Sequence, residues 1–336
     1  MAPMSEMLDM IRTLGDQIRW ARDLDAPDLP ANHEILVGGM GGSGIAGDFG
    51  AALATGTLGR VAVHKGYSPL PGWVQRVKPT VVAASYSGNT EETLDLVEAA
   101  ATAGLPIVTV TTGGRLAELS ASNAWPTIAV PTGLQPRAAV GYLAGALARL
   151  LNTLGVVPDQ TAALDEAADL VDAATTEGSE TWDMAQGLAK RLVGRVTVVY
   201  GGGPISSTAA QRWKTQINEN AKMPAWWSVL PELDHNEIVG WETLPSMTRE
   251  SIGIVALTDV ADHERVRARL DHTSQLTEFA VPWLGEVSAR GESELARLMS
   301  LTISGDLVSY MLAGEAGVDP VPVETIEKLK KLLVKD

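Results

Sequence analysis

The stretch GGMGGSG at residues 38–44 follows the largely apolar run EILV at 34–37 and precedes IAGD at 45–48. This order is typical of a strand, a glycine-rich turn and the start of a helix. The first N–H groups of a helix can bind an anion, and glycines let the backbone approach that anion closely. The glycines fit the dinucleotide pattern G-x-G-x-x-G, whereas Ser43 inside the turn favours a simple phosphate.

The dinucleotide interpretation requires an acidic residue about 20 positions further on, at the end of the next strand, where it would bind the ribose. The next strand-like run, at residues 61–65, ends in His64 and Lys65 and contains no acid. The sequence therefore favours a phosphate over a dinucleotide at this turn, and we expect no cofactor.

A second turn carries several hydroxyl groups. The stretch SYSGNT at residues 85–90 ends a strand-like run and precedes a helical pattern. Serine and threonine are common helix caps, which is the structural alternative for any one of these residues. Ser85, Ser87 and Thr90, together with Ser43 in the first turn, exceed what capping needs. Hydroxyls beside free helical N–H groups indicate a phosphate site.

The composition disfavours several classes of protein. The 336 residues carry 26 Lys and Arg against 41 Asp and Glu, a formal net charge of −15. With no basic stripe, a nucleic-acid partner is disfavoured, and a phosphate site must rely on local donors. The chain has no cysteine, which excludes disulfides and thiolate catalysis. No apolar run reaches ~18 residues and the N-terminus lacks a signal-peptide pattern, so we expect a cytoplasmic protein without a membrane partner.

Short apolar runs alternate with helical patterns in the first half of the chain, after an amphipathic helix at 5–24. This alternation predicts a doubly wound parallel sheet, whose ligands bind beyond the carboxyl ends of the strands. The predicted strands are 34–38, 60–64, 80–85, 106–111 and 126–130, and the predicted helices are 44–55, 90–103, 114–121 and 137–154.

The opening pattern recurs after an acidic, alanine-rich connection. The recurrence comprises a connection at 155–180, a strand at 195–200, a glycine turn at 201–203, a helix at 206–221 and strands at 251–257 and 277–281. We therefore predict an α/β protein of two doubly wound, flavodoxin-like subdomains. The N-terminal subdomain, with its leading helix, spans 1–154, and the C-terminal subdomain, with a final helix, spans 155–336.

Motifs in both halves resemble a known family. GGMGGSGIAGD at 38–48 and SYSGNTEETL at 85–94 resemble the sugar isomerase (SIS) domain. PRAAVGYL at 136–143, NENAK at 218–222 and ELDHNEIVGW at 232–241 are similar to the bifunctional phosphoglucose/phosphomannose isomerase family of archaea and bacteria. The turn motifs are specific for binding a phosphosugar, and the later motifs are specific for the isomerase.

The resemblance implies a phosphosugar substrate held at the two turns. Ser43, Ser85, Ser87 and Thr90 would bind its phosphate, and Gly42 would give close backbone approach. The implied reaction interconverts glucose 6-phosphate and fructose 6-phosphate, with mannose 6-phosphate as a further candidate substrate. A proton moves between C1 and C2 through an enediol(ate), and neither a metal nor a cofactor is needed.

Glu219 is the candidate base. It is a carboxylate flanked by amides, late on a predicted helix, and we expect it near the carboxyl edge of a sheet, where proton abstraction is feasible. A solvated helix glutamate is the structural alternative. Within NENAK, Glu219 matches the position of the family's base.

His235 is the candidate for opening the sugar ring, since an imidazole suits acid–base work near neutral pH. The resemblance implies that this histidine is supplied across a dimer interface, so it implies a homodimer with shared active sites. Glu237 is the neighbouring carboxylate. It either orients His235 or forms a structural ion pair.

Arg137 and Lys328 complete the candidate catalytic set. The resemblance implies that Arg137 binds the substrate and stabilises the negative intermediate, a role suited to a preorganised cation. Lys328 aligns with the family's C-terminal lysine, although other lysines crowd this tail. The chain departs from the family at Val321, where a threonine is associated with the mannose substrate, and this departure puts the phosphomannose activity in question.

Two other functions fit parts of the sequence. A non-catalytic phosphosugar sensor would also use an SIS domain, but no basic DNA-binding helix pair is visible at the acidic N-terminus. An isomerase acting on a different phosphosugar remains open. A hexosamine synthase of the amidotransferase type is disfavoured because its N-terminal cysteine nucleophile is absent.

Overall fold

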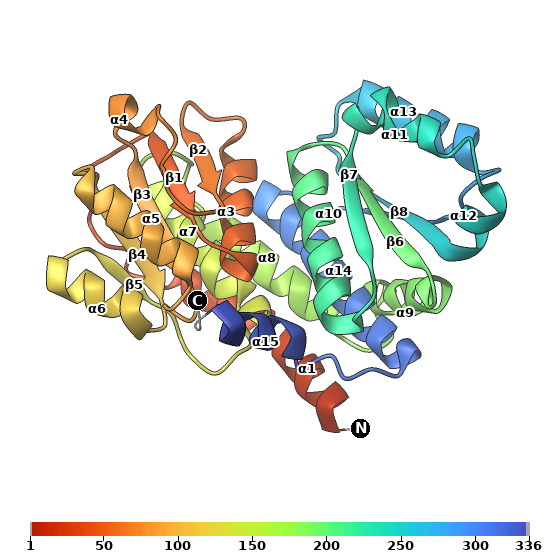
Figure 1. Cartoon of the computed structure of the whole chain (residues 1–336), viewed down its shortest axis with the longest axis horizontal. Coiled ribbons are helices and arrows are strands. Elements are labelled where there is room, and N and C mark those ends of the chain that lie inside the picture. Colours follow the sequence, from red (N-terminus) through yellow and green to blue (C-terminus); the bar gives the residue numbers. More distant parts are fainter. Residues whose placement is uncertain (1, 334–336) are drawn as a thin grey trace.

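The computed structural model describes residues 2–333, and its two parallel sheets stand on either side of a layer of helices (Figure 1). The first sheet has the strand order β2-β1-β3-β4-β5, and every neighbouring pair in it is parallel. This is the flavodoxin-like order 2-1-3-4-5. The strands are β1 (Glu34–Gly38), β2 (Arg60–His64), β3 (Thr80–Ser85), β4 (Ile107–Thr111) and β5 (Thr127–Ala129).

The second sheet repeats this order without a fifth strand. Its strands lie in the order β7-β6-β8-β9, again all parallel. They are β6 (Val196–Gly201), β7 (Ala225–Val229), β8 (Ile252–Thr258) and β9 (Trp283–Ser288). The fold class predicted from the sequence, two doubly wound parallel α/β units, is therefore confirmed. The division at residue 154/155 stays a prediction.

One hydrophobic core joins the two sheets. Alternate strand residues such as Val37 and Val82 in the first sheet, and Val199 and Val255 in the second, pack with the intervening helices in one cluster. The helices of this layer are α2 (Leu14–Arg22), α3 (Gly41–Ala54), α7 (Val140–Thr153), α8 (Thr161–Ala174), α9 (Glu180–Leu192), α10 (Pro204–Gln216) and α14 (Glu294–Ala316). The two halves thus share one apolar core, which fixes their position relative to each other.

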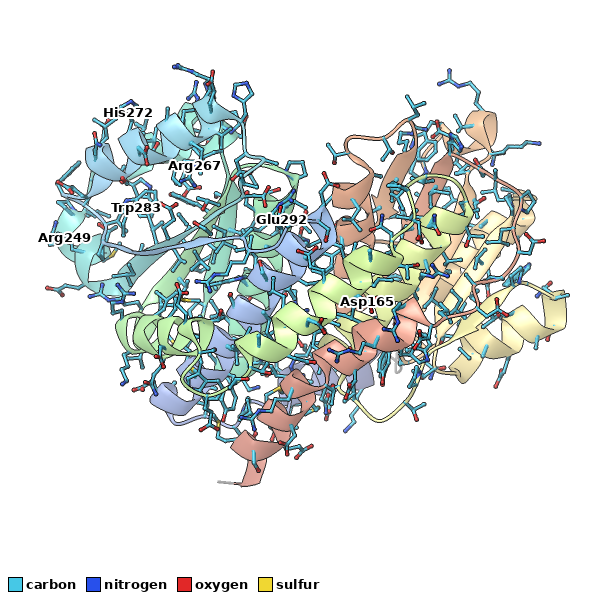
Figure 2. The ribbon with its side chains drawn as sticks, turned by 180° about the vertical axis from the view of Figure 1, so that it is seen from behind. Asp165, Arg249, Arg267, His272, Trp283 and Glu292 are labelled. Carbon is cyan, nitrogen blue, oxygen red and sulfur yellow. The ribbon has the colours of Figure 1, made fainter. Side chains whose placement is uncertain are left out.

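Smaller clusters cover the two outer faces. On the first sheet, α4 (Val74–Val77), α5 (Glu91–Thr102) and α6 (Gly114–Asn123) pack on Leu36, Val81 and Ala83. The second sheet is covered by α13 (Glu264–Thr277) together with Leu233 and Trp241 from the segment after β7. The short helices α11 (Glu237–Gly240) and α12 (Pro245–Ser251) contribute no residue to this cluster. Figure 2, seen from behind, labels Trp283 at the start of β9 (Trp283–Ser288), where its indole donates a 3.0 Å hydrogen bond to the hydroxyl of Thr277 at the end of α13.

Several elements differ from the sequence-based expectation. The strand expected at 277–281 is wrong, because Thr277 ends α13 and the strand lies at 283–288. Ala280 and Val281 are buried in a turn, and so they imitate a strand in the sequence. The helix expected at 5–24 is two helices, α1 (Ala2–Arg12) and α2.

Strand β7 and helix α14 are among the elements that were not predicted. Strand β7 is an edge strand that exposes Trp226 and Trp227, and so it lacks the apolar run expected of a buried strand. The 23-residue helix α14 is buried on most of its surface, and so it lacks an amphipathic period. Its Gly305 makes room for the ring of Trp213, which an added Cβ would approach to 2.4 Å.

The C-terminal segment leaves α14 and reaches the first half of the chain before the last helix, α15 (Glu324–Leu333). No helix within residues 2–333 combines the length and the apolar character needed to cross a bilayer.

Candidate active site

The two predicted phosphate turns meet at the carboxyl edge of the first sheet. Strand β1 leads into α3 on one side and β3 leads into α5 on the other, so the chain changes direction between these neighbouring strands. In open α/β sheets, ligands bind at this switch point. The turns at 38–43 and 85–90 therefore lie where the topology favours a ligand.

Hydrogen bonds join the two turns. The Tyr86 N–H donates to Ser43 Oγ at 3.2 Å, linking the second turn to the start of α3. The Ser85 and Thr90 hydroxyls lie 2.9 Å apart, and the Asn89 N–H donates to Ser87 Oγ at 3.3 Å. Thr90 is the N-cap residue of α5, but its side chain makes no capping hydrogen bond. The structure therefore brings all four hydroxyl residues predicted from the sequence together, and capping does not account for Thr90.

Gly42 places the first turn against Arg137. A Cβ added at Gly42 would lie 2.7 Å from the Pro136 carbonyl oxygen and 3.4 Å from the Arg137 Cα. Only glycine permits this approach between α3 and the 3₁₀ turn η1 (Pro136–Ala138) without displacement. The backbone of Arg137 is thereby held next to the candidate phosphate site.

The Arg137 side chain is 4% exposed and donates three hydrogen bonds. Its Nε donates to Asn220 Oδ1 at 2.7 Å, and its Nη2 donates to the carbonyl oxygens of Pro320 and Val321 at 2.6 and 2.8 Å. Its Nη1 faces the Glu219 carboxylate at 3.8 Å. Burial lowers the pKa of Arg137, and Glu219 opposes that shift. The one nitrogen that faces a carboxylate rather than a structural acceptor is therefore Nη1.

Glu219 lies in a π-helical turn, η2 (Ile217–Ala221), that continues α10. Such turns widen the backbone locally and are frequent at functional sites. Its side chain is 26% exposed, so it is accessible to a ligand. The expectation that Glu219 lies at a carboxyl edge needs refinement. It precedes β7 and so lies at the amino edge of the second sheet, but through Arg137 it faces the carboxyl edge of the first.

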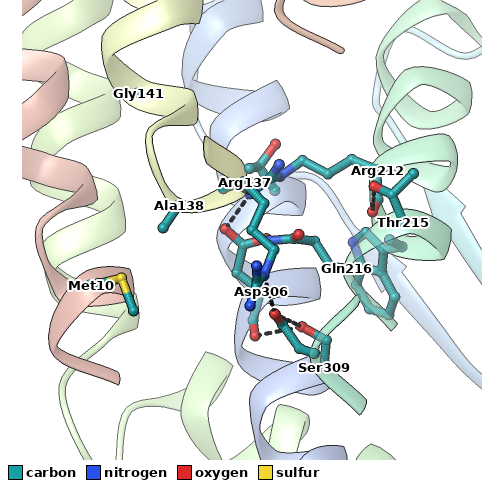
Figure 3. A network of polar contacts seen from close by, with 12 residues as sticks. Met10, Arg137, Ala138, Gly141, Arg212, Thr215, Gln216, Asp306 and Ser309 are labelled. Atoms are coloured by element: carbon teal, nitrogen blue, oxygen red, sulfur yellow. Dashed lines mark hydrogen bonds and ion pairs between the residues drawn. The ribbon is translucent and has the colours of Figure 1, made fainter. Parts of the chain in front are cut away.

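A buried polar network fixes this arrangement (Figure 3). Arg212, on α10, donates to the Arg137 carbonyl at 3.1 Å and to Asp306 Oδ2 at 2.8 Å. Gln216 donates to the other Asp306 oxygen at 2.7 Å, and Asn220 donates to Ser309 Oγ at 3.0 Å. No sequence pattern pointed to Asp306 and Ser309, because they belong to the unpredicted helix α14.

A cavity of about 670 Å³ adjoins the carboxylate of Glu219. Asn218, Glu219 and Lys222 line one side, and residues between 318 and 326 line the other. The two phosphate turns do not line it, so in this structure the cavity extends from Glu219 towards the C-terminal helix.

Lys328 is not brought to Glu219. It is exposed on α15 and pairs with Glu324 at 3.0 Å, one helical turn away. The lysine beside Glu219 is Lys222, which belongs to the NENAK motif but was not predicted as a site residue. Val321 contributes its carbonyl to Arg137, while its side chain packs against the main core.

His235 is exposed at the opposite edge of the second sheet from Glu219. It follows β7 in a 3₁₀ turn, η3 (Glu232–His235), whereas Glu219 precedes β7. Glu237 does not orient it. Both oxygens of Glu237 accept hydrogen bonds from hydroxyls, those of Tyr200 and Ser228. Burial, and then Glu237, raise the pKa of Tyr200. One chain by itself therefore does not bring His235 to the base.

The corresponding turn of the second half is filled by a carboxylate of the chain itself. Asp262 Oδ1 and Oδ2 lie 3.1 and 3.2 Å from the Ser206 hydroxyl at the start of α10, and Oδ2 accepts the Asp259 N–H at 2.8 Å. A Cβ added at Gly203 would lie 2.2 Å from Asp262 Oδ1. The carboxylate occupies the place of an anion, so the repeated turn offers no second open site.

Comparisons with known proteins identify relatives of this chain. Residues 182–333 match the family described as "Bacterial phospho-glucose isomerase C-terminal SIS domain". The chain is 36% identical to a bifunctional phosphoglucose/phosphomannose isomerase of Caldicellulosiruptor bescii, covering 98% of this chain and 99% of that protein. It is likewise 36% identical to one of Aquifex aeolicus, covering 99% of each. Among solved structures, a hypothetical protein from Thermus thermophilus shares the fold, with a TM-score of 0.68 at 17% identity over 99% of this chain and 90% of that one.

The Asp306→Asn variant should lose about 3–5 kcal/mol of unfolding free energy, because Arg212 would then be a buried charge without its partner. Urea unfolding followed by circular dichroism measures this loss. Glu118→Gln is the matched control, since Glu118 pairs with Arg115 on the surface, and its loss should stay within about 1 kcal/mol. An equal loss in both variants would contradict the role given to the buried network.

Proposed function

The chain belongs to the bifunctional phosphoglucose/phosphomannose isomerase family, and on this premise we propose that it interconverts glucose 6-phosphate and fructose 6-phosphate, with mannose 6-phosphate as a second substrate. The observation that carries the proposal is the Glu219 carboxylate facing Arg137 Nη1 at 3.8 Å, beside the glycine turn that begins α3. The cation therefore lies next to the base, and its backbone lies next to the anion-binding turn.

The phosphate is held at the switch point of the first sheet. Ser43, Ser85, Ser87 and Thr90 supply hydroxyls, and Gly42 keeps the backbone open to close approach. Since the chain carries a net charge of −15, long-range attraction does not draw the substrate in, and the local donors provide the affinity. A phosphorylated sugar is charged and does not cross a bilayer, which supports a cytoplasmic location for the enzyme.

Glu219 removes the proton from C2 of the open-chain aldose. The electrons of that C–H bond form the C1–C2 double bond, and the aldehyde oxygen becomes the enediolate oxygen. Glu219 then returns the proton to C1, C2 becomes the ketone, and the proton of the C2 hydroxyl passes to the enediolate oxygen, which becomes the C1 hydroxyl of fructose 6-phosphate. Arg137 Nη1 stabilises the negative charge on the intermediate, and the buried hydrogen bonds on its other nitrogens hold it in place for that role.

The ring-opening step uses His235 of the partner subunit. Within one chain His235 lies exposed at the far edge of the second sheet, where it can enter the active site of a second copy. Trp226, 56% exposed on the edge strand β7, is an apolar residue near this turn that supports a protein contact there. The proposed enzyme is therefore a homodimer with two shared sites.

Lys328 takes part through α15, whose first residues line the cavity. A shift of α15 would be needed to bring its ammonium to the substrate. Mannose 6-phosphate differs from glucose 6-phosphate only at C2, which becomes planar in the shared enediol, so the same base can serve both. Val321 supplies no hydroxyl for this discrimination because valine has none, and its side chain packs against the core.

Replacing Glu219 with Gln should lower kcat for fructose 6-phosphate by about 10²–10⁴-fold, because the base is lost while the shape of the side chain is kept. A coupled assay that detects glucose 6-phosphate measures kcat and KM. The exposed Glu98→Gln is the matched control and should retain wild-type turnover. Unchanged turnover in folded Glu219→Gln would refute the proposed base.

Mixing two inactive variants tests the shared site. Glu219→Gln and His235→Asn, each inactive alone, should regain about a quarter of wild-type activity after co-refolding at equal amounts, because half of the dimers are mixed and each carries one intact site. Activity of the mixture against the separate variants is the measurement. If His235→Asn alone remains fully active, or the mixture stays silent while mixed dimers form, the sites are not shared in this way.

A further inference from the structure

Lys222 ends the π-helical turn in a conformation that side chains rarely adopt. Its φ is +57°, in the left-handed region that glycine and asparagine enter more readily. Left-handed non-glycine residues persist where their surroundings hold them, and they gather at functional sites. The contacts of its side chain give a reason for a lysine here.

The Lys222 ammonium donates to backbone carbonyl oxygens from two distant parts of the chain. One belongs to Glu219, the candidate base, three residues earlier. The others belong to Pro320 at 3.3 Å and Pro322 at 2.6 Å, close to the C-terminus. Three ammonium hydrogens thus have three acceptors, and the cation links the turn of the base to the C-terminal segment.

The segment 320–322, called here the strap, has few other ways to be held. Two of its three residues are prolines, which have no N–H to donate. Each of its three carbonyl oxygens accepts a hydrogen bond from a cationic side chain. Arg137 donates to Pro320 and Val321. Lys222 donates to Pro320 and Pro322. Arg137 and Lys222, called here the clasp, therefore hold the strap together.

The strap in turn fixes one wall of the cavity beside Glu219. Pro322 lines the cavity, and so do Glu324, Thr325 and Ile326 at the start of α15. None of the described residues of α15 is buried, so packing of this helix does little to hold the wall. Burial and the nearby charge of Arg137 lower the pKa of Lys222, as expected of a cation enclosed in this clasp.

We propose that Lys222 is a positioning residue for the isomerase reaction. Its ammonium ties the backbone of Glu219 to the strap, and so it fixes the position of the base relative to Arg137 and to the cavity wall formed by the C-terminal segment. This inference rests on the proposed function. It predicts an effect on turnover rather than on substrate affinity, because the two phosphate turns make none of these contacts.

Lys222→Met removes the charge and keeps the length of the side chain. The kcat for fructose 6-phosphate should fall about 10–100-fold, since small displacements of a catalytic group cost rates of this order, while KM changes by less than about threefold. Lys222→Arg should recover most of the turnover. Lys330→Met, at an exposed lysine of α15, is the control for charge removal and should leave kcat unchanged.

Amide hydrogen exchange supplies a second readout. Amides of residues 321–333 should exchange faster in Lys222→Met than in the wild type, whereas those of 85–90 should not change. Lys222→Gly also lacks the ammonium, and because glycine accepts the positive φ, this variant keeps the fold if methionine does not. It should show the same loss of kcat and the same faster exchange.

Wild-type kcat in both Lys222→Met and Lys222→Gly would overturn the proposal. So would a loss of kcat with unchanged exchange of the strap, because that result would point to direct contact between Lys222 and the substrate. An inactive wild-type protein would refute the proposed function instead, and the exchange experiment would still test whether Lys222 holds the strap.

Discussion

A guanidinium withdrawn from water needs a hydrogen-bond acceptor for nearly every N–H, and the site is organised around that requirement at Arg137. Its acceptors come from Asn220 and from the strap, and its own backbone carbonyl accepts from Arg212. Three stretches far apart in the sequence are thereby held together: the turn after β5, the π-helical turn of Glu219 and the C-terminal segment. The position of the base relative to the phosphate turns follows from satisfying one buried cation.

The two halves have similar topology and different uses. In the first, the switch point between β1 and β3 carries glycines and hydroxyls that leave room for an anion. In the second, Asp262 occupies the equivalent turn, and burial raises the pKa of this carboxyl. The second half instead contributes the amino edge of its sheet, where Glu219 faces the first half. The candidate active site is therefore built between one carboxyl edge and one amino edge, so the repeat does not yield two sites.

How much the sequence could predict depended on how local the chemistry was. The turn at 38–44 and Ser85, Ser87 and Thr90 were recognised because glycine and hydroxyl patterns act over a few residues. The pairing of Arg212 with Asp306 was not, because two buried charges reveal their partnership only once α10 and α14 are packed. The π-helical turn likewise has no sequence periodicity that would predict it.

Helix α14 and strand β7 show the same limit for the fold. A helix buried on most sides has no amphipathic stripe, and an edge strand with exposed tryptophans has no buried apolar run. The family resemblance supplied His235 and Lys328 as site residues, and within one chain neither reaches Glu219. Their roles depend on a partner subunit and on the placement of α15, which no local pattern specifies.

The most direct test is a paired coupled assay on the purified protein without added metal. One reaction supplies fructose 6-phosphate and detects glucose 6-phosphate, and the other supplies mannose 6-phosphate and detects fructose 6-phosphate. We expect turnover in both reactions. Turnover in the first alone would restrict the enzyme to one epimer and make Val321 the first residue to restore to threonine. If neither reaction shows turnover while fructose 6-phosphate still binds, the proposed isomerase activity is contradicted. That result would indicate a phosphosugar sensor or a different substrate.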